Sequence, residues 1–279
     1  MSTPSDRGAE PAAPADVPVV ILCGGKGTRL REETGYRPKP MVEIGSYPIL
    51  WHIMKLYRHH GMRRFILCLG HLSWEIKRYF LHYKEMHQDL TLALDGSQPA
   101  TFGSRSEGDG DIGTEDWLVT LAETGEETGT GGRLKLVERY VDHQTFCFTY
   151  GDAVGRVDIA RLLAFHREQG RLATVTGVHP TSRYGEMRVD GPRVIEFNEK
   201  PTAEGVVSGG FFVFEREVFA YLSDDLALFF EHEPMRRLAR EGQLSVYLHE
   251  DFWHPMDTYR DYLHLNEIWR SGSAPWKVW

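Results

Sequence analysis

The chain has 279 residues, of which 41% are hydrophobic and 26% charged, and 32 basic against 40 acidic residues give it a formal net charge of −8. A general nucleic-acid binder needs a basic surface to displace counterions, so this charge argues against such a partner. The sequence contains no run of about 18 apolar residues, so we expect no membrane span. Cys23, Cys68 and Cys147 lie in apolar runs without a Cys-x-x-Cys pair, which favours buried, reduced thiols and a cytoplasmic location.

The first sixteen residues differ in composition from the rest of the chain. Residues 1–16 are rich in proline, alanine and charge and have no apolar run like that of a signal peptide, so we expect a disordered tail. Residues 17–23 then form a short, β-branched apolar run that ends at Gly24 and Gly25. Such a run is typical of a strand buried on both faces of a parallel sheet.

Helical and strand-like patterns alternate beyond this first run. An apolar stripe over residues 49–57 predicts a helix that Gly61 would end. Residues 65–69 predict a second strand, and residues 90–94 predict a third. Between these two strands, Ser73 is a candidate cap for another helix.

Residues 96–115 interrupt the alternation, because glycine, serine and acidic residues follow one another there without a period. A loop of this length is usually a functional lid or an insertion. After it, we expect helices over residues 132–141, 159–166, 218–222, 235–238 and 258–269, strands over 145–150 and 172–178, and shorter strands within 184–214. The order predicts an α/β fold, doubly wound around a mixed, mostly parallel sheet with a small antiparallel extension, in one domain over residues 17–279.

A glycine-rich turn with cations follows the first expected strand. Gly24, Gly25 and Gly27 would let backbone N–H groups approach a phosphate closely. Thr28 and Arg29 add a hydroxyl and a fork of donors. The dinucleotide-binding and Walker A patterns both fail, since the first lacks its third glycine and the second its Gly-Lys-Ser/Thr. A solvated turn is the alternative, but the position at a strand's carboxyl end favours a phosphate site.

Three charged residues are candidates for the chemistry of such a site. Lys39 lies between two prolines, so we expect it on a stiff, extended backbone from which its ammonium group could meet a reacting phosphate. Asp152 follows the strand expected at residues 145–150 and could hold Mg²⁺ beside phosphates. Asp257 precedes the last expected helix, where it is either a plain helix cap or a second metal ligand.

Two further motifs carry acidic residues. Glu199 could accept a sugar hydroxyl proton beside the cation of Lys200, although a surface salt bridge is the alternative. Asp109-Gly110-Asp111 has the D-x-D form that binds metal in many glycosyltransferases. It lies within the glycine-rich segment and not at a strand end, so we expect it to be solvated.

Taken in chain order, these motifs resemble those of the sugar-1-phosphate nucleotidyltransferases, and most closely the glucose-1-phosphate cytidylyltransferase branch. The resemblance covers residues 17–279. It rests on Gly24-Gly25-Lys26-Gly27-Thr28-Arg29-Leu30, Lys39-Pro40-Met41, Thr130-Gly131-Gly132-Arg133-Leu134, Tyr150-Gly151-Asp152, Glu199-Lys200-Pro201, Gly209-Gly210-Phe211-Phe212-Val213 and Pro255-Met256-Asp257-Thr258.

The resemblance implies a Rossmann-like nucleotidyltransferase fold, Mg²⁺ as cofactor and a homo-oligomer. It implies transfer of a cytidylyl group from CTP to a sugar 1-phosphate, foremost α-D-glucose 1-phosphate, giving CDP-glucose and pyrophosphate. The implied nucleotide-binding residues are Leu22, Gly24, Gly25, Gly27, Thr28, Arg29, Lys39 and Arg133. Those for the sugar phosphate are Gly185, Glu199, Lys200 and Ser208, those for the metal are Asp152 and Asp257, and the catalytic residues are Arg29, Lys39 and Asp152.

Two positions depart from the branch. Ser208 stands where asparagine is usual, and Ala153 stands where glycine is usual. A hydroxyl and an amide differ in hydrogen-bond reach, so the substrate could be a modified hexose or a cyclitol phosphate, and the nucleotide another NTP. A glycosyltransferase is less favoured because the D-x-D is not at a strand end. A non-catalytic nucleotide-sugar sensor is less favoured because Lys39, Asp152 and Asp257 are all present.

Overall fold

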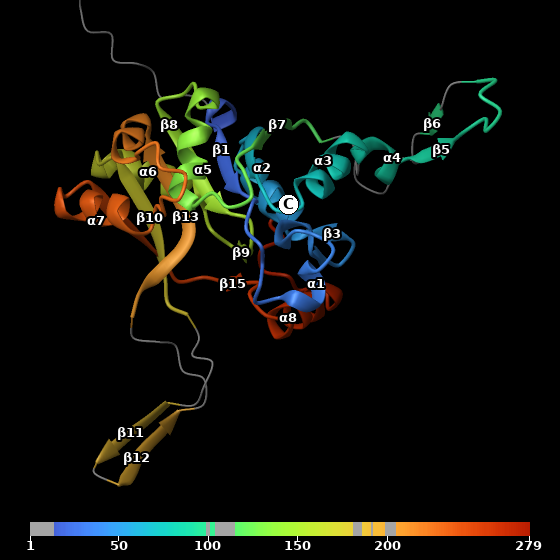
Figure 1. The fold of residues 1–279 in the computed structure, drawn as a ribbon. Coiled ribbons are helices and arrows are strands. Elements are labelled where there is room, and N and C mark those ends of the chain that lie inside the picture. Colours follow the sequence, from blue (N-terminus) through green and yellow to red (C-terminus); the bar gives the residue numbers. More distant parts are fainter. Residues whose placement is uncertain (1–13, 99–100, 104–114, 181–185, 191, 199–204) are drawn as a thin grey trace, which may run out of the picture.

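The computed structural model describes residues 14–98, 101–103, 115–180, 186–190, 192–198 and 205–279. Within them, a seven-stranded sheet runs in the order β14-β10-β13-β8-β1-β4-β7 (Figure 1). Its strands are β1 (Val19–Leu22), β4 (Arg64–Leu69), β7 (Leu118–Glu123), β8 (Thr145–Tyr150), β10 (Ala173–Val178), β13 (Val207–Glu215) and β14 (Leu244–His249). Only β13 runs antiparallel to its neighbours β8 and β10, which confirms the mixed, mostly parallel sheet.

The side chains of each central strand alternate between two hydrophobic cores, one on each face of the sheet. Val19 and Ile21 of β1 belong to one core, and Val20 and Leu22 belong to the other. Successive side chains of a strand point to opposite faces, so a strand that is apolar at every position needs cover on both sides.

Helices supply that cover on both faces. The first core takes apolar residues from α2 (Ile49–His59), α3 (Ser73–Leu81), α6 (Ile159–Gln169) and α8 (Tyr259–Arg270). The second takes them from α5 (Thr130–Leu136), η4 (Arg216–Tyr221) and α7 (Glu233–Arg240). The remaining helical segments are η1 (Pro14–Asp16), α1 (Arg31–Thr34), η2 (Lys39–Met41), α4 (Tyr83–His87) and η3 (Glu138–Tyr140). The doubly wound arrangement is therefore confirmed.

The third strand of the sheet is not the one predicted. Residues 90–94 contribute only to β5 (Asp89–Thr91), which pairs with β6 (Thr101–Gly103) outside the main sheet. Leu90, Leu92 and Leu94 are all exposed. The strand beside β4 is β7, at the edge of the sheet. Because β7 is half-exposed and mixes polar with apolar residues, its sequence lacks the continuous apolar run of a buried strand.

Three predicted helix boundaries can also be compared with the structure. The helix expected over residues 132–141 is divided into α5 and the 3₁₀ turn η3. Ser73 does not cap α3, because its hydroxyl donates to Glu123 at 2.9 Å and Leu72 is the residue that precedes the helix. Gly61 does follow the end of α2, with a φ of 96° that suits glycine.

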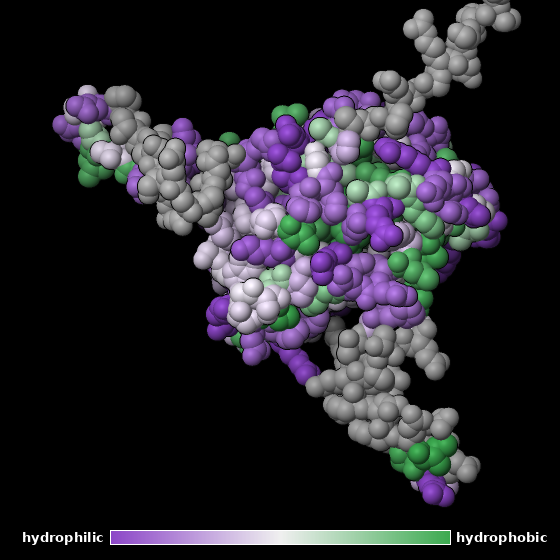
Figure 2. Space-filling view, turned by 180° about the vertical axis from the view of Figure 1, so that it is seen from behind, coloured by the Kyte–Doolittle hydropathy of each residue, from purple (hydrophilic) through white to green (hydrophobic). Residues whose placement is uncertain are grey.

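Four two-stranded sheets surround the main one in the described residues: β2 (Glu43–Ile44) with β3 (Tyr47–Pro48), β5 with β6, β9 (Ala153–Gly155) with β15 (Trp253–Pro255), and β11 (Glu186–Asp190) with β12 (Arg193–Asn198). Each of these pairs is antiparallel. The pair β11–β12 lies within residues 184–214, where a small antiparallel extension was predicted. On the face seen in Figure 2, hydrophobic residues lie in small groups among hydrophilic ones. Along the described part of the chain, no helix has the length and apolar character needed to cross a membrane.

Candidate active site

A pocket of about 420 Å³ lies where parallel strands β1, β7 and β8 reach their carboxyl ends. Ligands bind at this edge of open α/β sheets. The turn after β1 borders the pocket, together with the loop after β7 and the residues that follow β8. All the predicted nucleotide-binding residues line it: Leu22, Gly24, Gly25, Gly27, Thr28, Arg29, Lys39 and Arg133.

The glycine-rich turn approaches Lys39 closely at Gly27. Gly27 has a φ of 61°, and a Cβ atom there would lie 3.2 Å from Cβ of Lys39 and 2.8 Å from Cγ2 of Thr34. The Thr34 hydroxyl lies within hydrogen-bonding distance of the Gly27 and Leu30 carbonyls, at 3.0 and 2.8 Å. Only glycine tolerates both the positive φ and the close approach of Lys39 and Thr34. Gly27 therefore allows the glycine-rich turn and Lys39 to line the same pocket.

The backbone at Lys39 is helical and not extended as predicted. Met41 N–H donates to Pro38 and Val42 N–H donates to Lys39, which closes the single 3₁₀ turn η2. Pro38 takes the extended conformation instead, with φ −69° and ψ 151°. These turn hydrogen bonds outweigh the preference of a residue before proline for extended backbone. Pro40 packs on Gly151, where a Cβ atom would lie 3.1 Å from Cγ of Pro40.

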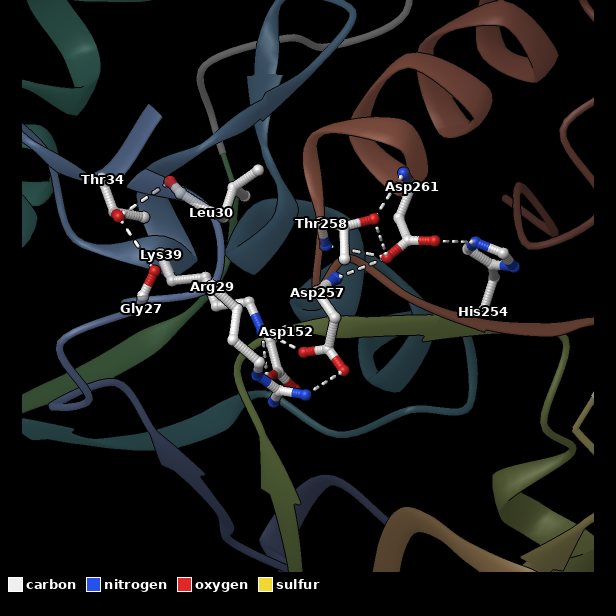
Figure 3. A network of polar contacts seen from close by, with 10 residues as sticks. All are labelled: Gly27, Arg29, Leu30, Thr34, Lys39, Asp152, His254, Asp257, Thr258 and Asp261. Atoms are coloured by element: carbon white, nitrogen blue, oxygen red, sulfur yellow. Dashed lines mark hydrogen bonds and ion pairs between the residues drawn. The ribbon is translucent and has the colours of Figure 1, made fainter. Parts of the chain in front are cut away.

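The side chain of Lys39 joins the two predicted metal ligands. Its Nζ lies 2.7 Å from Oδ2 of Asp152 and 2.7 Å from Oδ1 of Asp257, and only 10% of the side chain is exposed. Burial by itself lowers the pKa of Lys39, but the two carboxylates outweigh it and raise that pKa above the ordinary value. Arg29 Nη1 donates to Oδ2 of Asp257 at 2.9 Å, so two cations and two carboxylates meet at one point (Figure 3).

A two-stranded ribbon brings the two aspartates together from positions 105 apart in the chain. β9 begins immediately after Asp152 and β15 ends two residues before Asp257, and Ala153 is paired with Pro255. Met256 N–H donates to the Asp152 carbonyl at 2.8 Å, while Gly151 N–H donates to the Leu22 carbonyl at 3.0 Å. The ribbon therefore holds both carboxylates at the end of β1.

Asp261 fixes the backbone that carries Asp257 (Figure 3). Thr258 and Asp261 form a capping box at the start of α8. Oδ2 of Asp261 accepts from the N–H groups of Thr258 and Asp257, at 2.8 and 3.1 Å, and from the Thr258 hydroxyl. Oδ1 lies 3.2 Å from Nε2 of His254. Asp257 is thus not the helix cap, and its own carboxylate is directed at Lys39 and Arg29.

Arg133 is almost fully buried and donates to main-chain atoms of the loops around the pocket. Nη1 donates to the Leu69 and Gly125 carbonyls at 3.0 and 2.7 Å, and Nη2 to the Gly24 and Glu126 carbonyls, both at 3.0 Å. A Cβ atom on Gly24 would lie 2.1 Å from Nη1. Arg133 therefore links the glycine-rich turn, which follows β1, to the ends of β4 and β7.

Comparison with known proteins agrees with this geometry. The family described as "Nucleotidyl transferase" matches residues 18–271, which is most of the chain. This chain belongs to the nucleotidyl transferase family. It is 44% identical over 262 residues to the glucose-1-phosphate cytidylyltransferase of Salmonella typhi, covering 93% of this chain and 98% of that protein. It is 42% identical over 260 residues to a probable glucose-1-phosphate cytidylyltransferase of Bacillus subtilis, covering 93% and 99%.

Solved structures share the fold of this nucleotidyl transferase at lower identity. HddC from Yersinia pseudotuberculosis superimposes with a TM-score of 0.65 at 22% identity, covering 91% of this chain and 99% of that one. The inositol-1-phosphate CTP transferase of T. maritima superimposes with a TM-score of 0.59 at 16% identity, covering 91% and 96%. At such identities the likeness shows the fold alone.

Of the four residues predicted to bind the sugar phosphate, the structure describes Ser208 alone. Ser208 lies on β13, and its hydroxyl accepts from Gly210 N–H at 3.3 Å. Gly210 in turn touches Tyr150, since a Cβ atom there would lie 2.7 Å from the Tyr150 ring. Gly185, Glu199 and Lys200 lie outside the described residues, as do Asp109 and Asp111 of the D-x-D motif. Their roles stay predictions.

Two features of the site were missed from the sequence. Asp261 was not singled out, although the Thr258-x-x-Asp261 spacing before an apolar stripe is a capping-box signal. Residues 226–231 were given no role, yet Phe229 lines the pocket and Glu231 accepts from the hydroxyls of Tyr150 and Thr130. That segment has no motif or period that could have marked it.

Proposed function

We propose that this nucleotidyl transferase transfers a cytidylyl group from CTP to α-D-glucose 1-phosphate, giving CDP-glucose and pyrophosphate. The observation that carries the proposal is the meeting of Lys39 and Arg29 with Asp152 and Asp257, because Lys39, Arg29 and Asp152 line the same pocket as the glycine-rich turn. The choice of substrates is supported by two relatives, a glucose-1-phosphate cytidylyltransferase and a probable one, which are 44% and 42% identical to this chain over 93% of its length.

In the proposed reaction, a phosphate oxygen of glucose 1-phosphate attacks the α-phosphorus of CTP in line. The new P–O bond forms as the bond from the α-phosphorus to the bridging oxygen breaks, and pyrophosphate leaves with that electron pair. The second pKa of a phosphate monoester is about 6, so the nucleophile is already a dianion near neutral pH and needs no strong base.

The main obstacle to this reaction is repulsion between two anions within a protein of net charge −8. Lys39 and Arg29 place two cations near the point of attack, and the carboxylates of Asp152 and Asp257 hold them in position. Because these carboxylates also balance the two cations, a bound Mg²⁺ would supply the net positive charge. A fixed charge in a partly buried site stabilises a charged transition state without further reorganisation. Positioning of the two substrates supplies the rest of the acceleration.

The donor set fits Mg²⁺. Asp152 and Asp257 bring two carboxylates together at Nζ of Lys39, and the described residues contain no group of three or more His, Cys, Asp or Glu side chains that could hold a metal ion without substrate. Mg²⁺ is commonly held by one or two carboxylates together with substrate phosphates and waters. We therefore assign Asp152 and Asp257 as its ligands; when bound, the ion would neutralise phosphate charge and orient the α-phosphate.

The identity of the sugar is the part of the proposal that depends least on the site geometry. Ser208 offers a short hydroxyl where the branch usually has an amide, so a modified hexose or a cyclitol phosphate is the competing substrate. A cytoplasmic location and a homo-oligomeric assembly also belong to the proposal. Light scattering on the purified full chain measures the assembly directly.

Pyrophosphate release measured with each of the four NTPs against a panel of sugar and cyclitol 1-phosphates tests the function. We expect release with CTP and α-D-glucose 1-phosphate in the presence of Mg²⁺, and loss of release when the metal is chelated. Release with another pair at higher kcat/KM would replace the named substrates. No release with any pair, from protein that is folded by circular dichroism, would overturn the proposal.

A further inference from the structure

Residues 226–231 lie directly against the start of α5. Gly129 N–H donates to the Leu226 carbonyl at 2.7 Å, and Gly131 and Gly132 N–H both donate to the Leu228 carbonyl, at 2.9 and 3.1 Å. A Cβ atom on Gly129 would lie 2.3 Å from the Leu228 oxygen, and one on Gly132 would lie 2.5 Å from the Leu226 oxygen. The glycines around Thr130 are therefore required for this close packing of two backbones.

The other end of the segment is anchored as firmly. Phe230 is fully buried in the second core, and its N–H donates to the Thr130 hydroxyl oxygen at 2.9 Å. The Glu231 carboxylate accepts from the hydroxyls of Thr130 and Tyr150. The backbone is thus fixed on both sides of Phe229, through the Leu228 carbonyl before it and the Phe230 N–H after it.

Between these anchors, the ring of Phe229 is left half-exposed at the pocket. It is 49% exposed and lines the same pocket as Gly24, Arg133 and Thr130. The His232 ring packs on it, with the ring centroids 5.3 Å apart. An exposed aromatic ring on a fixed backbone is a preformed surface for a flat ligand, because little conformational freedom is lost on contact.

We propose that Phe229 forms the surface against which the nucleotide base stacks. The inference rests on the proposed function, because it requires that the pocket binds a nucleotide. The segment that carries Phe229 is anchored at the start of α5, whereas the cations that suit phosphates meet at Asp152 and Asp257. The negative face of an aromatic ring repels a phosphate but stacks on a planar heterocycle. The base is therefore the part of CTP that matches this ring.

The stacking accounts for affinity and not for the choice among bases. Every base has a π-face, so stacking on an aromatic side chain is tolerant of base identity. Removing the ring should weaken the binding of CTP and UTP by the same factor. It should leave inorganic tripolyphosphate, which has no base, bound as before.

The test compares Phe229→Ala and Phe229→Trp with wild type in the full-length protein. Calorimetry gives Kd for CTP, UTP and tripolyphosphate, and steady-state kinetics give KM for each substrate. We expect Phe229→Ala to raise Kd and KM for CTP about tenfold, as loss of one stacked base does, with the KM for the sugar phosphate unchanged. Phe229→Trp should restore binding. Trp74→Ala, which removes an exposed aromatic ring on α3 outside this pocket, serves as the matched control.

The outcomes separate this inference from the proposed function. Equal weakening of CTP and tripolyphosphate would show a structural role for Phe229, and a rise only in the KM for the sugar phosphate would place the ring against the sugar. Either result overturns the inference, as does unchanged CTP binding in Phe229→Ala. Failure of wild type to bind any nucleotide or to release pyrophosphate would instead overturn the proposed function itself.

Discussion

At Lys39, burial and neighbouring charge act on the side chain in opposite directions. Burial disfavours the charged ammonium, while the Asp152 and Asp257 carboxylates favour it more strongly, so its pKa is raised and the cation persists. The sequence singled out this residue by its position between two prolines, but the extended backbone predicted from those prolines is wrong. Its partners were not predictable, because both aspartates lie more than one hundred residues away in the chain.

Replacing Lys39 with alanine should lower kcat by about 10²–10³, as the loss of one fixed electrostatic donor does elsewhere. Initial rates of pyrophosphate release measure the change. Lys135→Ala is the matched control, because Lys135 pairs with Glu138 within three residues along the helical surface and does not line the pocket. Near wild-type turnover in a folded Lys39→Ala protein would remove Lys39 from the catalytic group.

His52 is a buried residue whose protonation opposes folding. It is fully buried, and burial lowers its pKa to about 4 from the ordinary 6.5. The Ile44 carbonyl, 3.0 Å from Nε2, can only accept, and the Trp276 indole N–H, 3.4 Å from Nδ1, can only donate. Both nitrogens of the neutral ring are therefore satisfied, and a proton added at Nδ1 would displace the indole contact.

From this lowered pKa we expect a loss of stability on the acid side. The unfolded state takes up the proton first, so the contribution of His52 is present above about pH 6.5 and is lost as the pH falls toward 4. Between pH 7 and pH 5 the free energy of unfolding should fall by about 2 kcal/mol through this residue. Urea denaturation of wild type and His52→Leu at both pH values isolates the effect. Equal losses in the two proteins would contradict it.

Among the secondary-structure elements, α8 and the β9–β15 ribbon do most to build the site. The ribbon brings Asp152 next to Asp257, and the capping box of α8 holds the backbone that follows Asp257. The helix itself could be predicted, because its apolar stripe and its cap are local signals. The ribbon could not, since β9 and β15 have three residues each and their pairing depends on contacts between distant segments.

Substitutions at the starts of α8 and α3 test which hydroxyl caps its helix. Thr258→Ala should lower the free energy of unfolding by about 1 kcal/mol, because the Thr258 side chain accepts from Asp261 N–H at the start of α8. Ser73→Ala is the matched change at α3, where the hydroxyl donates to the exposed Glu123 and does not cap the helix. It should cost less than about 0.5 kcal/mol. Equal losses on urea denaturation would refute the distinction.

Across the whole molecule, the site lies where parallel strands of the main sheet end together, and Arg133 joins those ends. Its guanidinium donates to carbonyls at or just after the ends of β1, β4 and β7, and so holds the glycine-rich turn and the loop after β7 at the border of one pocket. The resemblance implies that Arg133 binds the nucleotide. In the structure, its guanidinium N–H groups donate to main-chain carbonyls of the loops that border the pocket.

Arg133→Met should therefore destabilise the whole fold as well as the pocket. It removes a charged donor from the carbonyls of Gly24, Leu69 and Gly125, although Gly24 keeps the N–H of His71 and Leu69 keeps the N–H of Thr124. We therefore expect the free energy of unfolding to fall by about 2 kcal/mol. Urea denaturation measures the change. Arg139→Met is the control, since Arg139 is exposed on η3, and a comparable loss there would show that the effect does not come from these bonds.

The sequence by itself determined the doubly wound fold, the glycine-rich turn and the identity of the charged residues, because apolar period, turn chemistry and motif order are local properties of the chain. Only the tertiary structure decided that Lys39 joins Asp152 to Asp257, that Arg133 binds main-chain carbonyls and that Phe229 faces the pocket. The same limit explains the misplaced third strand, because an edge strand such as β7 is selected by its pairing with β4 and not by its own apolar pattern. Contacts between segments far apart in the chain depend on how strands and helices pack, and no local pattern records that packing.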